Sequence, residues 1–330
     1  MQTKEILTPT ASAPSTRTQD FALVIGVDHY PRFRSLSGAV NDARDLHAWI
    51  CDPDGGGVAP ANARLVESTL APSTPIQKQL DAALHELLDV AGTAGGGRRF
   101  YFTFSGHGAS SIDDDRDVAL LLATWSRGGA DLPLSSEKYR LALLAMRLFD
   151  EIVVLLDCCR TSVVDVLGAS PGFSSSPRDH AQPPRMMIAY ATEHGTSAFE
   201  SREADRWQGL FTRRLLDILR HSPHGVTARE LESELRNEPL APGQEVEVRN
   251  TLTRDSRFGT RGRPPRIEVE FLPGTTFVRV LDVDGNVVHH SDGPSPWLVE
   301  LEAGLYQVVN QAGTSKPVAH KKYGSTKVVI

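Results

Sequence analysis

The sequence predicts an α/β domain with a mostly parallel central sheet flanked by helices, followed by a small all-β, sandwich-like domain. Two observations predict the α/β domain: continuous apolar runs, typical of strands buried on both faces, and stretches of helical periodicity that alternate with them. A third observation predicts the β domain. From about Arg266 the chain breaks into short alternating runs separated by Asp-Gly, Gly-Pro and Ala-Gly turns.

Composition and charge bound the class of protein. The chain has 330 residues, 40% of them hydrophobic, which favours two domains with sizeable cores. Its net charge is −6 without a long basic run, and this argues against nucleic acid or an anionic membrane as partner. No stretch approaches the ~20 apolar residues of a membrane helix, and the N-terminus lacks a signal-peptide core. Three cysteines, two of them adjacent, form no disulfide framework, so we expect a cytoplasmic protein.

The first part of the chain contains a leader, a strand and two helices. Residues 1–19 are rich in Thr, Ser, Pro and Ala and are expected to form a flexible leader. Residues 21–28 (FALVIGVD) are a continuous apolar run and are predicted as the first buried strand. Residues 40–50 and 77–90 carry apolar side chains at helical spacing, and a glycine-rich stretch ends the second helix.

The middle of the chain repeats the pattern. Residues 98–104 (RRFYFTF) are predicted as a strand that SGHG interrupts. Residues 117–124 are predicted as a further strand and residues 138–149 as a helix. Residues 151–157 (EIVVLLD) are the third central strand, and CCR follows it directly.

A Ser/Pro/Gly-rich loop, residues 168–185, precedes the last two core elements of the α/β domain. Residues 186–192 (MMIAYAT) are predicted as the fourth central strand and residues 209–220 as an amphipathic helix. A basic, Pro/Gly-bearing linker at 253–265 leads to the β domain at 266–330. In the β domain, Trp297 and Tyr306 are expected to be core or turn residues.

The SGHG and DCCR motifs each follow a predicted central strand. In parallel sheets, sites form at the carboxyl ends of the strands, so His107 and Cys159 are expected to meet there. A cysteine attacks carbonyl groups as its thiolate and needs a base beside it, which a histidine supplies. Gly106 and Gly108 allow sharp turns, and the backbone N–H groups of Gly108 and Cys159 are the expected oxyanion donors.

Simpler interpretations compete with this one. A histidine at a strand end is often structural, and a cysteine there is often a small buried hydrophobe. Cys158 is expected to be such a residue, with its side chain in the core while Cys159 faces outward. The two cysteines and His107 could also ligate zinc, but adjacent cysteines span a tetrahedral site poorly and no fourth ligand is evident. No metal is therefore expected.

Six segments in this order resemble the caspase/metacaspase peptidases, most closely the bacterial members: FALVIGVDHY, LSGAVNDARDL, FTFSGHG, VVLLDCCRTS, AYATEHGTSAFE and GLFTRRLL. The His-to-Cys spacing also fits, since caspases place the histidine about 50 residues before the cysteine. The resemblance covers about residues 20–222 and implies the caspase-hemoglobinase fold. It implies a peptidase domain at 20–252, with a larger part at 20–167, an interdomain loop at 168–185 and a smaller part at 186–252.

Carried over by motif, the resemblance implies His107 as the catalytic base and Cys159 as the nucleophile. It also implies that Asp42, Ser105 and Asp157 line the S1 pocket. Caspases proper carry Gln where this chain has Asp157, and they bind aspartate. Two carboxylates instead favour Arg or Lys at P1, because a buried acidic pair is stabilised by a cation. Helix capping by Asp42 and a structural role for Asp157 are the alternatives.

The chain also departs from the family pattern. Arg160 follows the nucleophile where metacaspases have His. The acidic run 112–117 resembles calcium-responsive loops of some metacaspases but lacks a recognisable set of spaced oxygen ligands. The residues therefore do not support calcium activation, and no cofactor is expected. If P1 is basic, Arg178 and Arg185 in the interdomain loop are candidate self-cleavage sites.

The function predicted from these residues is a cysteine endopeptidase that acts on proteins or peptides, with neither nucleic acid nor membrane as partner. The β domain is expected to bind a protein partner or a ligand and to regulate the enzyme. A catalytically silent caspase-like scaffold is the first alternative, because a fold alone does not guarantee activity. A hydrolase that uses the same two residues on a non-peptide acyl substrate is the second.

Overall fold

The computed structural model describes residues 19–111, 114–163, 168–173, 182–222, 225–253, 256–259, 266–301, 304–320 and 325–330. All of the expected leader except Gln19 lies outside these residues, as does most of the expected linker.

A six-stranded sheet forms the centre of the α/β domain, in the order β13-β9-β7-β3-β1-β2. Its strands are β1 (Asp20–Gly26), β2 (Ala63–Glu67), β3 (Gly97–Ser105), β7 (Phe149–Asp157), β9 (Arg185–Tyr190) and β13 (Glu247–Asn250). Neighbouring strands are parallel except for β13, which runs antiparallel to β9. The predicted mostly parallel sheet is confirmed, and its four apolar runs are the four central strands.

The register of the central strands explains where the site lies. Gly26 pairs with Ser105, and Ser105 pairs with Asp157, so the carboxyl ends of β1, β3 and β7 form one row. The backbone N–H of Gly106 then donates a hydrogen bond of 3.1 Å to the carbonyl of Asp157. The SGHG and DCCR segments are therefore neighbours in space as well as in the pattern of the sequence.

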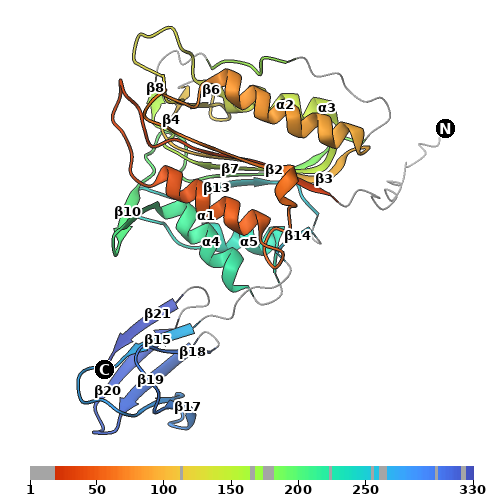
Figure 1. Cartoon of the computed structure of the whole chain (residues 1–330). Helices are drawn as coiled ribbons and strands as arrows, with labels where there is room; N and C mark the ends of the chain where they lie inside the picture. Colours follow the sequence, from red (N-terminus) through yellow and green to blue (C-terminus); the bar gives the residue numbers. More distant parts are fainter. Residues whose placement is uncertain are drawn as a thin grey trace, which may run out of the picture.

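Helices cover both faces of the sheet (Figure 1). On one side lie α2 (Gln77–Thr93) and α3 (Ser136–Met146), and on the other lie α1 (Ala39–Cys51), α4 (Leu210–His221) and α5 (Ala228–Arg236). The buried apolar residues accordingly form two clusters, one on each face. This separation follows from the strands, whose alternate side chains are apolar on both sides.

Local signals fix the ends of α3. The Ser135 hydroxyl accepts a hydrogen bond from the backbone N–H of Lys138, and Arg147 ends the helix in the left-handed conformation at φ 52°. The predicted helix 138–149 is therefore too long, because Phe149 already begins β7.

Short strands surround the carboxyl edge of the central sheet. One small sheet contains β4 (Gly108–Ser111), β5 (Val118–Leu120), β6 (Leu134–Ser135) and β8 (Ser162–Val163). β10 (Glu200–Glu203) and β11 (Arg206–Gly209) form a hairpin. The predicted strand at 117–124 is thus three residues long. A single-turn 3-10 helix, Pro60–Asn62, precedes β2.

The first part of the predicted linker belongs instead to the α/β domain. β14 (Arg257–Phe258) pairs with β12 (Val226–Thr227), and Phe258 is 2% exposed within the core of the α/β domain. The guanidinium of Arg99 lies 4.4 Å from the Phe258 ring and donates to the Arg257 carbonyl at 2.8 Å. A buried aromatic side chain with a cation over its ring is part of a core. The α/β domain therefore extends to residue 259 at least.

The C-terminal β domain contains two packed sheets, as predicted. A three-stranded sheet has the order β18-β15-β21 and a four-stranded sheet the order β17-β16-β19-β20. Their bounds are β15 (Arg266–Glu270), β16 (Val278–Leu281), β17 (Val287–Ser291), β18 (Trp297–Glu300), β19 (Gly304–Asn310), β20 (Ser315–His320) and β21 (Ser325–Val329). Valines dominate its separate core, and Trp297 and Tyr306 pack against that core. Within the described residues, no helix has the length and apolar character needed to cross a membrane.

Candidate active site

A cleft of about 530 Å³ opens at the carboxyl edge of the central sheet. Its lining includes every residue predicted for the dyad and the S1 pocket: Asp42, Ser105, His107, Asp157 and Cys159. The remaining walls come from the loop that holds residues 34–37, the segment 197–200 and β11. Residues as far apart in the chain as Arg34 and Gly209 are thus brought into one cavity.

The imidazole of His107 is held on several sides. Its Nε2 lies 2.6 Å from the carbonyl oxygen of Arg34. Because a carbonyl only accepts, Nε2 carries the proton and Nδ1 keeps the lone pair in the neutral ring. The rings of Tyr30 and Phe33 flank the imidazole at centroid distances of 4.8 and 4.9 Å. Burial, with the Arg34 guanidinium adding to it, lowers the pKa of His107 below its ordinary value.

Tyr30 also fixes the backbone of the histidine. Its hydroxyl accepts a hydrogen bond from the backbone N–H of His107 at 2.9 Å and donates to the carbonyl of Leu121 at 3.1 Å. Tyr30 is 1% exposed, so neither bond competes with water. This tyrosine was not predicted as a functional residue, although it stands in the FALVIGVDHY segment.

The two adjacent cysteines face different environments, as predicted. Cys158 is 2% exposed within the apolar core, whereas Cys159 is half-buried and lines the cleft. The thiol of Cys159 accepts a hydrogen bond from the backbone N–H of Ala198 at 3.4 Å. Burial raises the pKa of Cys159, so the thiol is protonated at neutral pH.

Among the hydrogen bonds of the described residues, none joins His107 to Cys159. A neutral imidazole with a lowered pKa and a neutral thiol with a raised pKa also disfavour a resting ion pair. The arrangement suits a base that removes the thiol proton when the substrate is bound, since such contacts often tighten only in the complex.

Gly108 lies directly against the nucleophile segment. A Cβ at this position would lie 2.7 Å from both the Cys158 sulfur and the Cys159 carbonyl oxygen, so no larger residue fits. The backbone N–H of Cys159 has no acceptor among the described residues. Such a free N–H beside the thiol is what an oxyanion donor requires.

The carboxylate of Asp42 points across the cleft toward β11. It accepts hydrogen bonds from the Gly209 N–H at 3.0 and 3.1 Å and from the Ser105 hydroxyl at 3.0 Å. Asp42 does not cap α1, because Asp28 and Glu200 take the N–H groups of Ala39 and Gly38, each at 2.7 Å. Burial and the neighbouring Asp157 carboxylate raise the pKa of Asp42 well above its ordinary value.

Asp157 is the second buried carboxylate. Its Oδ2 accepts from the backbone N–H and the hydroxyl of Thr212, at 3.0 and 2.7 Å, and so also satisfies a free N–H in the first turn of α4. Its Oδ1 accepts no hydrogen bond from the described residues. Burial raises the pKa of Asp157 to about 6, and the Thr212 hydrogen bonds act in the opposite direction.

The two carboxylates converge on Gly209. A Cβ at Gly209 would lie 2.3 Å from Asp157 Oδ2 and 2.8 Å from Asp42 Oδ2. Two buried carboxylates this close repel each other, which a bound cation offsets. Glu200 also lines the cleft and adds a third carboxylate that was not predicted from the sequence. Its signal was present, because Glu200 ends the AYATEHGTSAFE segment.

Arg160 turns away from the cleft. It is 1% exposed, lies 4.0 Å from the Tyr190 ring centroid, and pairs with Glu247 on β13. It also donates to the backbone carbonyl of Asp115. Arg160 therefore links the nucleophile segment to the edge strand and to the acidic loop.

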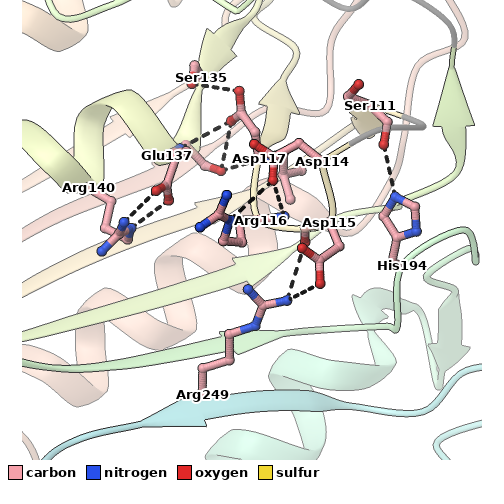
Figure 2. A network of polar contacts seen from close by, with 12 residues as sticks. Ser111, Asp114, Asp115, Arg116, Asp117, Ser135, Glu137, Arg140, His194 and Arg249 are labelled. Atoms are coloured by element: carbon pink, nitrogen blue, oxygen red, sulfur yellow. Dashed lines mark hydrogen bonds and ion pairs between the residues drawn. The ribbon is translucent and has the colours of Figure 1, made fainter.

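The described carboxylates of the acidic loop are all engaged (Figure 2). Asp114 accepts from the backbone N–H of Arg116 at 2.9 Å, and Asp115 accepts from Arg249 at 2.9 Å. Asp117 accepts from the Ser135 hydroxyl at 2.8 Å at the start of α3. Within the described residues, no three His, Cys, Asp or Glu side chains group closely enough to hold a metal ion. Ile112 and Asp113 lie outside the described residues, and calcium dependence stays a prediction to be tested.

Of the two candidate self-cleavage sites, Arg178 and Arg185, the structure describes the second. Arg178 lies outside the described residues. Arg185 is exposed, but it is the first residue of β9 and pairs with Glu151 on β7. A peptidase binds its substrate as an extended free strand, so cleavage after Arg185 would require this end of β9 to leave the sheet.

Known proteins match the part of the chain that forms the α/β domain. A family model for the caspase domain matches residues 19–238. A curated relative named as a probable protease, from a Desulfuromonadales bacterium, is 29% identical over 220 residues, which cover 61% of this chain and 26% of the relative. The chain thus spans about a quarter of that relative's length.

Two solved structures are also similar. A protein from Geobacter sulfurreducens gives a TM-score of 0.44 at 16% identity, over 74% of this chain and 98% of its own. Caspase-1 from Spodoptera frugiperda gives 0.47 at 12% identity, over 75% and 91%. The family model matches well over half of the chain and includes the whole cleft, and this chain belongs to the caspase-domain family of peptidases.

Proposed function

We propose that this protein is a cysteine endopeptidase that uses Cys159 and His107 to cleave peptide bonds after Arg or Lys. One observation carries the proposal: a single cleft contains a half-buried thiol, an imidazole and two buried carboxylates. A nucleophile, its base and a cation-binding pocket are the parts that such a reaction needs.

In the first half of the proposed reaction, His107 Nδ1 takes the proton of the Cys159 thiol, and the sulfur attacks the scissile carbonyl carbon. The carbonyl oxygen becomes an oxyanion opposite the N–H groups of Cys159 and Gly108. His107 then gives its proton to the leaving nitrogen, the C–N bond breaks, and an amine departs. A thioester joins Cys159 to the first half of the substrate.

In the second half, water replaces the amine. His107 removes one proton from the water, whose oxygen attacks the thioester carbon. The C–S bond breaks, the proton returns to the sulfur, and a carboxylic acid leaves. Throughout, the hydrogen bond from Nε2 to the Arg34 carbonyl keeps Nδ1 as the reacting nitrogen and stabilises the imidazolium.

The proposed P1 preference rests on Asp42 and Asp157. Both are under 10% exposed, and burial raises their pKa values because a negative charge is costly away from water. A guanidinium or ammonium group would supply the missing charge, and Asp157 Oδ1 offers it a free acceptor. An aspartate at P1 would add a third buried carboxylate and is therefore disfavoured.

One observation favours the alternative of a silent scaffold, namely that no hydrogen bond joins the thiol to the imidazole. A regulatory role for the β domain, a cytoplasmic setting and independence from nucleic acid and membranes belong to the proposal as expectations. The family membership itself implies protein or peptide substrates.

The test is cleavage of fluorogenic peptides that differ only at P1, with Arg, Lys or Asp, with and without calcium. Wild type is expected to turn over the Arg and Lys peptides. Cys159→Ala should abolish turnover, whereas Cys158→Ala, which alters the neighbouring thiol in the core, should retain it. Turnover of only the Asp peptide would refute the P1 assignment, and equal activity of wild type and Cys159→Ala would refute the nucleophile.

A further inference from the structure

A second cavity, of about 270 Å³, shares no lining residue with the cleft. Its apolar lining is formed by Ile76, Leu122, Trp125 and Leu132, with the polar Gln77 and Asp131 beside them. Leu132 is 53% exposed and Ile76 38%. Large apolar side chains that gather around an open cavity mark a surface that binds something.

Aromatic rings connect this cavity to the histidine. The Phe33 ring packs on the His107 imidazole at 4.9 Å and edge-on against Trp125 at 5.2 Å. Phe33 is itself 38% exposed. The apolar surface is therefore continuous from the imidazole, over Phe33, to Trp125 in the wall of the cavity.

The direction in which the substrate chain must run through the cleft decides which part of the substrate meets this surface. The P1 side chain points to Asp42 and Asp157, and the scissile carbonyl lies at Cys159. His107 must reach the leaving nitrogen to protonate it, so the chain that follows the scissile bond departs on the His107 side. Ser197 to Glu200 also line the cleft, and Ala198 among them is bonded to Cys159, so this segment is left for the residues that precede the bond.

We propose that the cavity is a subsite for a large apolar side chain of the substrate, about three residues after the scissile bond. The inference rests on the proposed peptidase function and adds a preference that the acidic pocket does not supply. An extended chain advances ~3.3 Å per residue, so the two ring-to-ring steps from His107 to Trp125 correspond to about three residues. Asp131 at the cavity disfavours an acidic residue at that position.

The experiment uses internally quenched peptides with Arg at P1 and identical residues before the bond. Leu, Ser or Glu is placed in turn at the second, third and fourth positions after it. Burial of one large apolar side chain is expected to raise kcat/KM for Leu over Ser by about 10-fold, most strongly at the third position, with Glu weakest.

Two variants test whether this cavity causes the preference for Leu over Ser. Leu132→Ser should reduce the Leu/Ser ratio of kcat/KM to about one, because this exposed leucine lines the cavity. Leu141→Ser is the matched control, since Leu141 is 49% exposed on α3 and outside the cavity. It should retain the full ratio. The ratio is insensitive to a general loss of active enzyme, so partial unfolding of a variant does not imitate the result.

Each outcome has a separate meaning. A wild-type ratio near one, with the Arg peptides still cleaved, overturns the subsite and leaves the proposed function standing. Absence of turnover for every Arg peptide overturns the proposed function and the subsite with it. If Leu132→Ser keeps the ratio and converts a dimer into a monomer, the cavity is a contact between copies of this chain, and the subsite is overturned.

Discussion

The acidic half of the cleft and its cysteine–histidine half are built in different ways. Asp42 and Asp157 are buried, and fixed donors from β3, β11 and α4 hold both oxygens of Asp42 and Oδ2 of Asp157 in place. The Cys159 thiol is hydrogen-bonded to Ala198 and Ser197 on a loop, and the His107 ring is bound to Arg34 instead of to the thiol. We infer that charge recognition is preorganised, whereas the reacting pair is completed by the substrate.

The position of each group in the fold explains this difference. Ser105 and Asp157 are the last residues of β3 and β7, where the ladder of the sheet fixes their backbones. His107 and Cys159 follow those strands by two residues each and stand on loops. A strand end gives a rigid carboxylate, and the loop after β7 lets the Cys159 thiol adjust by the small distance that the chemistry requires.

Among the variants, Asp157→Asn is expected to have the largest effect, and this effect should be confined to the acidic half of the cleft. It removes one of the two charges that bind the P1 cation, so kcat/KM for Arg peptides should fall about 100-fold. A peptide with citrulline at P1, the neutral analogue of Arg, should be cleaved as well by the variant as by wild type. Asp89→Asn, an exposed change on α2, is the control. Equal losses for both peptides would mean that Asp157 acts through folding and not through charge.

The pH dependence of kcat/KM should distinguish the acidic half of the cleft from its cysteine–histidine half. The pKa of Asp157 is raised to about 6, so below this pH the pocket carries a proton and loses attraction for a cation. For Arg peptides, kcat/KM should fall by about tenfold per pH unit as the pH drops below 6. The lowered pKa of His107 keeps its base form available there. The citrulline peptide should show no such fall near pH 6, and identical profiles for both peptides would assign the titration to the reacting pair.

Tyr30→Phe should give a smaller effect, confined to the cysteine–histidine half. The ring remains, but the His107 N–H and the Leu121 carbonyl lose their buried partner. We expect kcat to fall about 10-fold with little change in KM, because the base is displaced while the pocket is untouched. Tyr139→Phe removes another buried hydroxyl, bonded to Asp81 at 2.5 Å, and should lower stability without changing kcat. Equal kcat losses in the two variants would make the Tyr30 effect one of stability alone.

Much of the fold could be predicted because the central strands are continuous apolar runs and most helices have strong periodicity. The location of the site also followed, since SGHG and DCCR each come at the carboxyl end of such a strand. β2, β13 and the β10–β11 hairpin were missed because they are short and partly polar, and their partners lie far away in the chain. Phe258 was assigned to a linker because nothing near it in sequence reveals the ring and cation that it contacts.

The site could be predicted as a set of residues but not as a set of contacts. Gly209 donates to Asp42 across 167 positions, and Thr212 donates to Asp157 across 55. No local sequence pattern predicts a donor that lies so far away along the chain. The same holds for the Arg34 carbonyl, which selects the tautomer of His107 as a backbone atom and leaves no mark in the residue type.

Covalent labelling of the resting protein with a P1-Arg acyloxymethyl ketone peptide, followed by peptide mass mapping, tests the proposed nucleophile and pocket most directly. We predict a single adduct on Cys159, formed much more slowly in Asp157→Asn and at the normal rate in Asp89→Asn. An adduct on Cys51 or Cys158, or no adduct while a small thiol reagent modifies Cys159 freely, would contradict it.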